Sequence, residues 1–186
     1  MQKFKRKNMQ KVVLKPLENG DKEQFIKDNQ EAFLYGVTIE FGLRDEHYEE
    51  DGEIISRETI ENSLKGGTAY RIFFENKKVG GVVLKIDKQT KFGELELLFI
   101  SPNFHSKGIG KKAWQEIEKM HPKIKIWQTC TPYFEKRNIH FYLHSCGFKI
   151  IEFYNKFNKD PNSKAEFDEN GNEICHEMFL FEKIIL

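Results

Sequence analysis

Residues 94–110 read ELELLFISPNFHSKGIG, and this stretch decides the fold. A short apolar strand enters a proline-containing loop that ends in KGIG at residues 107–110, where an amphipathic helix is predicted to begin. Backbone N–H groups at the N-terminus of a helix have no acceptor within the helix, and they attract anions. Because the two glycines lack a Cβ atom, a pyrophosphate can approach the backbone closely. The stretch therefore predicts a phosphorylated carrier whose reactive end lies along the preceding strand.

The glycine pattern alone leaves other interpretations open. A strand-to-helix turn without any ligand is equally compatible with Gly108 and Gly110. The dinucleotide pattern G-x-G-x-x-G is incomplete; its variant with Ala113 in the last position fits formally, but no acidic strand end follows at the expected distance. The P-loop pattern is absent because the chain contains no Gly-Lys-Ser or Gly-Lys-Thr.

Hydrophobic periodicity predicts an alternation of strands and helices over the rest of the chain. Strands are expected at residues 11–17, 68–74, 79–86, 92–100, 124–128, 148–154 and 177–185. Helices are expected at residues 21–33, with Asp21 as a possible cap, and at 56–64, 108–120 and 135–146. Short polar connectors join three consecutive strands into an antiparallel meander, and the alternation after it indicates an α+β or mixed α/β fold.

The composition favours one compact cytoplasmic domain. The chain has 186 residues with 17 phenylalanines, so we expect a single domain at residues 11–186 after a basic tail, residues 1–10. A net charge of +1 argues neither for nucleic acid nor for a membrane surface. No apolar run is long enough for a membrane span or a secretion signal. Three cysteines without metal-type spacing suit a reducing cytoplasm.

Two segments resemble the GNAT (Gcn5-related) N-acetyltransferases. Their acetyl-CoA-binding motif is written [Q/R]-x-x-G-x-[G/A], and the chain has HSKGIG at residues 105–110, with His105 in the place of Gln or Arg. The segment NIHFYLHSCGF at residues 138–148 is similar to the helix that carries the family's Asn and Tyr and ends in Gly-Phe. Tyr142 lies five residues before Gly147, where four is commoner. The order of elements over residues 11–186 matches as well.

The resemblance implies the GNAT-type acyl-CoA N-acyltransferase fold, a mixed sheet of about seven strands with flanking helices. The strands before and after the phosphate-loop helix would splay apart at a bulge, where backbone groups bind the pantetheine arm and the thioester carbonyl. The implied reaction moves an acetyl group from acetyl-CoA directly to a primary amine by general acid/base catalysis. The implied cofactor-binding residues are Leu98, Phe99, Ile100, His105, Ser106, Lys107, Gly108, Ile109, Gly110, Lys111, Asn138 and Tyr142.

The resemblance also implies that Tyr142 is the general acid for the coenzyme A thiolate. A half-buried helix tyrosine with an ordinary hydrogen bond is the alternative, and Asn138 could equally be a polar residue at a helix start. The preferred general base is Glu96, ahead of Glu94 and Glu40.

The period of the strand favours Glu96 as the general base. Glu96 would share a face with Leu98 and Ile100, and the opposite face would carry Leu95, Leu97 and Phe99. A carboxylate in apolar surroundings would have a raised pKa and could accept the proton of the amine directly or through water. A solvated carboxylate, or a pair with a nearby lysine, is an equal alternative.

Three further features have ordinary explanations. His140 and His144 are four residues apart but lack the glutamate of a zinc-protease helix and a third ligand, so no metal site is predicted. We expect Cys130 to be an inert, partly buried thiol rather than a nucleophile. We expect the basic tail to be solvated rather than bound to nucleic acid.

The acceptor pocket is expected between the first two strands, particularly at residues 33–48. Aromatic and acidic side chains there suit a cationic amine, although a solvated acidic loop is equally compatible; the aromatic ones are Tyr35, Phe41, His47 and Tyr48. The expected partners are acetyl-CoA and an amine acceptor, bound by a monomer or a homodimer. The alternative function is a catalytically degenerate acyl-CoA-binding sensor module; a nucleic-acid-associated protein that uses the basic tail is a third hypothesis.

Overall fold

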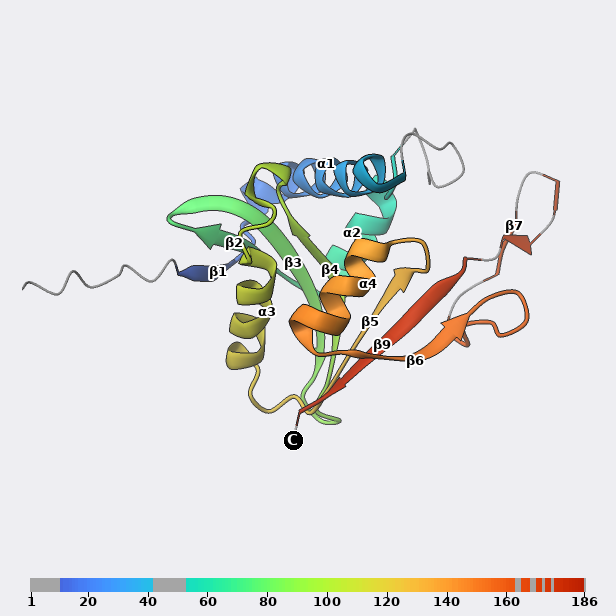
Figure 1. Ribbon diagram of the computed structural model, residues 1–186. Helices are drawn as coiled ribbons and strands as arrows, with labels where there is room; N and C mark the ends of the chain where they lie inside the picture. The colour runs from blue at the N-terminus through green and yellow to red at the C-terminus, as the bar shows by residue number, and fades with distance from the viewer. Residues whose placement is uncertain are drawn as a thin grey trace, which may run out of the picture.

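A seven-stranded mixed sheet forms the centre of the molecule, in the order β1-β2-β3-β4-β5-β9-β6 (Figure 1). The computed structural model describes residues 11–41, 53–162, 165–167, 170–171, 173–174 and 176–185, with the backbone alone for residues 39–41 and 166. The strands of this sheet are β1 (Val12–Pro16), β2 (Thr68–Phe74), β3 (Lys77–Asp87), β4 (Phe92–Ile100), β5 (Ile126–Pro132), β6 (Lys149–Tyr154) and β9 (Met178–Ile184). The expected mixed sheet with flanking helices is confirmed.

Helices cover both faces of the sheet (Figure 1). They are α1 (Lys22–Phe41), α2 (Arg57–Gly66), α3 (Ile109–Met120) and α4 (Lys136–His140), which continues as a π-helix (Phe141–Cys146). On one face, α1 and α2 pack in the apolar cluster around Phe25 and Phe99. On the other face, α3 and the π-helix pack in the cluster around Trp114 and Trp127. Among the described residues, no helix combines the length and apolar character that crossing a bilayer requires.

Strands β2, β3 and β4 form the predicted antiparallel meander, and β1 extends it at its edge. β1 pairs with β2, β2 with β3, and β3 with β4, each in antiparallel register. The turn between β2 and β3 has positive φ at both central residues, Glu75 (49°) and Asn76 (63°). Such a turn twists in the same sense as the strands that it joins, which keeps the hairpin paired.

Several predicted boundaries need correction. Helix α1 runs to Phe41, beyond the expected end at residue 33, and β5 begins at Ile126 rather than at residue 124. The polar segment before β9 contains a two-stranded hairpin, β7 (Glu166–Phe167) with β8 (Glu173–Ile174). These short elements lack an apolar period, so nothing in the pattern marked them.

Asp21 is not a helix cap, because its carboxylate binds an arginine of the sheet. The Arg71 side chain on β2 is only 2% exposed; its Nε donates to Asp21 Oδ2 over 2.8 Å, and its Nη1 donates to Asp28 Oδ2 over 2.7 Å. The guanidinium also lies over the Phe25 ring, 5.0 Å from its centroid. Arg71 therefore ties the first turns of α1 to the sheet through a buried ion-pair network.

β4 and β5 run parallel but pair over three residues only. The pairs are Phe92 with Ile126, Gly93 with Trp127 and Glu94 with Gln128, after which the two strands separate (Figure 1). The predicted splay is thus confirmed, and it opens between the far halves of β4 and β5. We call the space between Leu95–Ile100 and Thr129–Pro132 the gap.

A β-bulge at Glu96 lies where the gap begins. Leu95 pairs with Leu84 and Leu97 pairs with Val83, so Glu96 is an extra residue on β4. A bulge shifts the alternation of side chains along its strand. Leu95 accordingly packs in the cluster around Trp114, while Leu97 packs around Phe25 on the other face. The expectation that Leu95 shares a face with Leu97 is therefore wrong.

Candidate functional site

The loop before α3 presents a series of backbone donors. Ser106 and Gly108 both adopt positive φ, 60° and 67°, and α3 begins at Ile109. Within the described part of the chain, the N–H groups of residues 106–111 donate to no backbone carbonyl, and the helical ladder starts with Lys112 N–H donating to Gly108 O over 3.1 Å. We call residues 106–111 the donor loop. Unpaired N–H groups at a helix start and in a turn of this kind attract phosphate oxygens.

His105, directly before the donor loop, forms hydrogen bonds to backbone carbonyls of the preceding residues. Its backbone N–H donates to Pro102 O over 3.1 Å, and its ring Nε2 lies 2.5 Å from Ile100 O. The ring edge also meets the Tyr35 ring on α1, with centroids 5.3 Å apart. Burial lowers the pKa of His105; the hydrogen bond to Ile100 opposes this, and the charge of Arg137 adds to it. The neutral ring donates Nε2–H to Ile100 O, so the free donors of the loop begin at Ser106.

The two glycines of the motif have different neighbours. A Cβ atom at Gly108 would meet nothing within 4 Å, and this glycine is required by its left-handed backbone. A Cβ atom at Gly110 would lie 3.1 Å from the Phe141 ring, so Gly110 lets α3 approach the π-helix. Lys111 is exposed, and Lys107 Nζ donates to Asn103 O over 3.1 Å. The loop therefore adds lysine charge to its backbone donors.

The edge of β4 that faces the gap offers backbone groups at alternate residues. Thr129 Oγ1 donates to Leu95 O over 2.8 Å, so Leu95 O points toward β5. In an antiparallel ladder, successive residues face the partner strand and the outside in turn. After the bulge, Leu98 and Ile100 therefore turn their backbone groups to the gap, and Ile100 O is already bound by His105. Leu98 N–H is a donor aimed at the gap.

Phe99 does not offer its backbone to the gap. A Cβ atom at Gly80 on β3 would lie 2.1 Å from Phe99 O, so this carbonyl faces β3. The Phe99 ring packs edge-on against Phe25, with centroids 5.1 Å apart. The alternation of the ladder turns the Phe99 backbone away from the gap, so binding of the cofactor by Phe99, expected alongside Leu98, stays a prediction that its backbone does not support.

Tyr142 lies on the inner side of the gap, in the core. Its side chain is buried, with the rings of Phe181 and Phe148 at centroid distances of 5.3 and 5.8 Å. Burial raises the pKa of Tyr142 far above its usual value, and the Thr129 side chain lowers it in part. Thr129 is the first residue of β5 beyond the segment paired with β4, so the Tyr142 side chain lies near the base of the gap.

The π-helix accounts for the unusual spacing between Tyr142 and Gly147. Gly147 N–H donates to Tyr142 O, a contact that spans five residues, and Gly147 ends the helix with φ of 79°. A π-helical turn holds one residue more than an α-helical turn. The extra residue is thus absorbed within one turn, and Tyr142 keeps its contact with the glycine cap. No residue in the sequence announces this turn; the spacing itself was the available signal.

Asn138 and Thr129 differ in how clearly the sequence marked them. Asn138 is half-buried on α4, and its Nδ2 lies 3.5 Å from Thr131 Oγ1 on β5. Thr129, which no motif marked, donates to Leu95 O, and its side chain acts to lower the pKa of Tyr142. Arg137, also unmarked, acts electrostatically on His105. Predicting the roles of Thr129 and Arg137 from the sequence would have required knowing how β4 and β5 are aligned.

The carboxylates of β4 lie on the α1 and α2 face. Glu96 Oε1 accepts from Lys85 Nζ over 2.7 Å, and its side chain is 15% exposed. Of the two environments left open for Glu96, the pair with a nearby lysine is confirmed, and the apolar surroundings are wrong. Burial raises the pKa of Glu94, and the neighbouring charge of Glu96 raises it further.

Cys130 on β5 is exposed, which corrects the expectation of a partly buried residue. The pKa of its thiol is raised to about 12, first by desolvation and then by the carboxylates of Asp160, Glu94 and Glu96. A thiol with such a pKa carries almost no thiolate near neutral pH, so Cys130 is a poor nucleophile.

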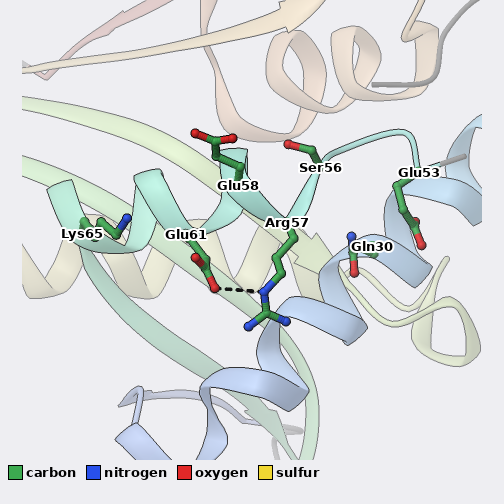
Figure 2. Close-up of a pocket in the computed structure, with 7 residues that line it drawn as sticks. All are labelled: Gln30, Glu53, Ser56, Arg57, Glu58, Glu61 and Lys65. Carbon is green, nitrogen blue, oxygen red and sulfur yellow. Dashed lines mark hydrogen bonds and ion pairs between the residues drawn. The ribbon is translucent and has the colours of Figure 1, made fainter. Parts of the chain in front are cut away.

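A pocket of about 410 Å³ lies between α1 and α2 (Figure 2). Its lining is polar and comprises Gln30, Glu53, Ser56, Arg57, Glu58, Glu61 and Lys65. Arg57 donates to Glu61 over 3.0 Å, the contact drawn in Figure 2, and to Glu23 over 2.6 Å. None of these residues belongs to the donor loop or to the gap.

Several predicted features fall outside the described part of the chain. They are the basic tail (residues 1–10), His47 and Tyr48 of the acceptor segment, the side chains of Glu40 and Phe41, and Cys175. The rings of His140 and His144 lie on the surface with centroids 4.6 Å apart. No group of three or more metal-ligating side chains occurs among the described residues.

Comparison with known proteins gives the same architecture. The sequence profile described as "Acetyltransferase (GNAT) family" matches residues 24–148. A Bacillus subtilis (strain 168) protein described as "Uncharacterized protein YrkN" is 40% identical over 186 residues, which cover 98% of both chains.

Two solved structures illustrate the likeness of fold. The PaiA N-acetyltransferase of Thermoplasma acidophilum, solved with coenzyme A, superposes with a TM-score of 0.64 at 21% identity, covering 94% of this chain and 99% of that chain. The spermidine N-acetyltransferase of Vibrio cholerae, solved with CoA and spermine, gives 0.62 at 14% identity, covering 94% and 95%.

Proposed function

Because the chain belongs to the acetyltransferase (GNAT) family, we propose that it transfers an acetyl group from acetyl-CoA to a primary amine. The observation that carries the proposal is the gap between β4 and β5, which opens beside the donor loop. A pyrophosphate bound by the N–H groups of residues 106–111 would leave the pantetheine arm free to enter the gap. Lys107 and Lys111 would add charge attraction.

The described residues suit direct transfer. The nitrogen lone pair of the amine attacks the thioester carbonyl, and Leu98 N–H is a donor for the oxygen that becomes negative. One such donor stabilises an acyl-transfer transition state by roughly 3 kcal/mol. Glu96 accepts the amine proton directly or through a water molecule, the C–S bond breaks with its electron pair on sulfur, and Tyr142 gives its proton to the sulfur. The products are an N-acetylamine and coenzyme A.

The acid and the base would approach the gap from opposite faces. Tyr142 belongs to the cluster around Trp114, whereas Glu96 is paired with Lys85 on the α1 and α2 face. The gap is the place where groups from both faces can reach one carbonyl. We therefore infer that coenzyme A enters from the α3 side and the acceptor from the α1 and α2 side.

A cationic amine suits the acceptor side. Glu96 and Asp160 both act electrostatically on Glu94, and all three carboxylates act on Cys130. Among the described residues, Lys85 is the cation that pairs with Glu94 and Glu96. An acceptor that carries a protonated group besides the neutral nitrogen that attacks would offset this excess of negative charge. The likeness to other acetyltransferases at 14–21% identity shows the fold, so the amine class rests on these carboxylates.

A paired binding and turnover experiment tests the proposal. Coenzyme A binding is measured by calorimetry, and acetyl transfer is measured as thiol release with acetyl-CoA and a panel of polyamines, amino acids, aminoglycosides and peptide N-termini. We expect binding together with thiol release for at least one amine, and mass spectrometry should find one added acetyl group on the acceptor. Tight binding without turnover for every amine would favour the sensor alternative. Absence of binding would reject both functions.

A further inference from the structure

A short connection, residues 101–105, joins the end of β4 to the donor loop. Ser101 N–H donates to Val79 O on β3 over 2.8 Å, so the start of the connection is fixed to the sheet. Its middle is a 3₁₀-helix (Pro102–Phe104), and its last residue is His105, which is followed directly by the donor loop. The path of this connection therefore decides where the donor loop lies relative to the gap.

The His105 side chain folds back onto the end of the strand. Its ring Nε2 lies 2.5 Å from Ile100 O. A carbonyl oxygen only accepts hydrogen bonds, so Nε2 carries the proton and donates it. This contact ties the last residue of the connection to the last residue of β4, and the chain between the two forms a closed loop.

Two further observations restrict the ring to this position. The Tyr35 ring on α1 meets it edge-on, with centroids 5.3 Å apart. The second ring nitrogen, Nδ1, is buried and has no hydrogen-bond partner within the described part of the chain. A proton on Nδ1 would create a buried charge without an acceptor, which favours the neutral ring with its donor at Nε2. The polar contact that the side chain makes is therefore directed to β4.

The position of the donor loop matters because different elements would bind the two ends of acetyl-CoA. The pyrophosphate is proposed to bind the donor loop, and the thioester is proposed to lie beside Leu98 N–H in the gap. The pantetheine arm that joins these two ends has a limited length. A displacement of the donor loop relative to β4 would therefore move the thioester along the gap, and a shift of about 1 Å can lower a rate about a hundredfold.

We propose that His105 is a positioning residue, which sets the distance between the donor loop and the gap through its bond to Ile100 O and does not itself bind the phosphates. The inference rests on the proposed acetyl transfer and on the coenzyme A binding that this transfer requires. A glutamine at this position could make the same bond, because its amide nitrogen reaches about as far from the backbone as Nε2 of histidine.

Two ligands separate binding at the donor loop from binding in the gap. ADP carries the adenosine and the pyrophosphate of coenzyme A without the pantetheine arm, so it reports on the donor loop alone. His105→Phe keeps a ring beside Tyr35 and removes the donor. By calorimetry we expect ADP affinity to stay within about twofold of wild type and coenzyme A affinity to fall about tenfold, because only coenzyme A must fit both places. We expect kcat to fall about tenfold to a hundredfold.

Two amide substitutions test where the donor must lie. His105→Gln places an amide N–H near the position of Nε2, and we expect kcat within about threefold of wild type. His105→Asn places its amide near the position of Nδ1, short of Ile100 O, and should behave like His105→Phe. Thermal unfolding of each variant reports whether the fold is retained. If His105→Phe does not fold, the glutamine and asparagine variants carry the same comparison.

Lys107 supplies a matched control within the donor loop. Its Nζ also donates to a carbonyl of the connection, Asn103 O, over 3.1 Å, but this contact is exposed. Lys107→Met removes that contact together with a charge that acts on the pyrophosphate of both ligands. We therefore expect ADP and coenzyme A to lose affinity by the same factor of about three.

The possible outcomes are distinct. If His105→Phe lowers the affinities of ADP and coenzyme A equally, His105 acts on phosphate binding and the inference is wrong. It is also wrong if His105→Phe keeps wild-type coenzyme A affinity and kcat, if His105→Asn matches His105→Gln, or if the wild-type protein binds coenzyme A but not ADP. If the wild-type protein binds both ligands but acetylates no amine, the proposed transfer fails, and the affinities alone decide on His105.

Discussion

The two faces of the sheet are built for recognition in different ways. The face under α3 and the π-helix is largely apolar, with the ion pair Lys183–Glu118 among its described residues, and its candidate ligand contacts are backbone N–H groups in residues 106–111. The face under α1 and α2 holds charges, with Arg71, Lys85 and Arg57 each paired to carboxylates. Backbone recognition requires a particular loop shape, and glycines at fixed spacing encode it. Recognition by side-chain charge depends on residues that only the fold brings together.

The largest expected effect concerns the charged face and its one buried arginine. Arg71→Met leaves Asp21 and Asp28 without their guanidinium partner, and we expect the free energy of unfolding to fall by about 3–5 kcal/mol, measured by urea denaturation. Arg57→Met is the matched control, since the Arg57 pairs are exposed; no measurable change is expected. Equal losses in the two variants would contradict the contrast between buried and exposed pairs.

The same network gives a pH dependence of stability. Burial acts to raise the pKa of Asp21, but the hydrogen bonds and charges of Arg71 and Lys78 outweigh it, and the pKa is lowered. A carboxyl group with a lowered folded pKa stabilises the fold above its unfolded pKa, and this stability is lost as the pH falls through the folded value. Asp21→Asn should therefore unfold more easily at pH 7 and show a smaller further loss at about pH 3.

The next effect concerns the backbone recognition of the opposite face. Gly108→Asp places a negative charge where phosphate is proposed to bind, and repulsion at about 4 Å predicts a loss of coenzyme A affinity of roughly a thousandfold. Gly108→Asn is the control, because asparagine has the same shape, tolerates positive φ and carries no charge. Calorimetry measures the coenzyme A affinity of the two folded variants. A similar affinity in both would show that steric fit at this position, not charge, governs binding.

The sequence revealed the backbone-built part of the site and much less of the charged part. The meander and the donor loop follow from apolar periods and from Gly108 and Gly110, since these are local signals, whereas the splay was expected from the resemblance to the GNAT family. The bulge at Glu96 is not local, because an extra residue on one strand is visible only against its partner, and it reversed the expected side for Leu95. Lys85 pairs with Glu96 for the same reason: strand register, not spacing, joins them.

The role of Asp21, directly before the start of α1, was also harder to predict. Asp21 has the position of a helix cap, yet Arg71, fifty residues away, binds it in preference to the helix N–H groups. A charged donor outcompetes a backbone donor for a carboxylate. Capping rules consider only backbone donors close in sequence, so they cannot predict an ion pair with a distant arginine.

A third variant pair tests which carboxylate serves the acceptor side. Glu96→Gln should lower kcat about a hundredfold if Glu96 is the base, whereas Glu94→Gln should stay within about threefold of wild type. The pH profile adds a second measure. Glu96→Gln removes a charge that raises the pKa of Glu94, so any residual activity that depends on Glu94 should begin at lower pH. The reverse ranking of the two variants would assign the base to Glu94.

The smallest expected effect concerns Cys130, which lies on β5 beside the gap. Its thiol pKa of about 12 means that the thiolate is scarce, so Cys130→Ser should leave kcat unchanged. Alkylation by iodoacetamide at pH 8, followed on the Cys130 peptide by mass spectrometry, should be roughly a thousandfold slower than for an ordinary thiol. The urea-unfolded chain supplies that ordinary rate, because unfolding exposes Cys130 to water and separates it from Asp160, Glu94 and Glu96. Rapid alkylation of the folded protein would mean that neither desolvation nor these carboxylates suppress the thiolate.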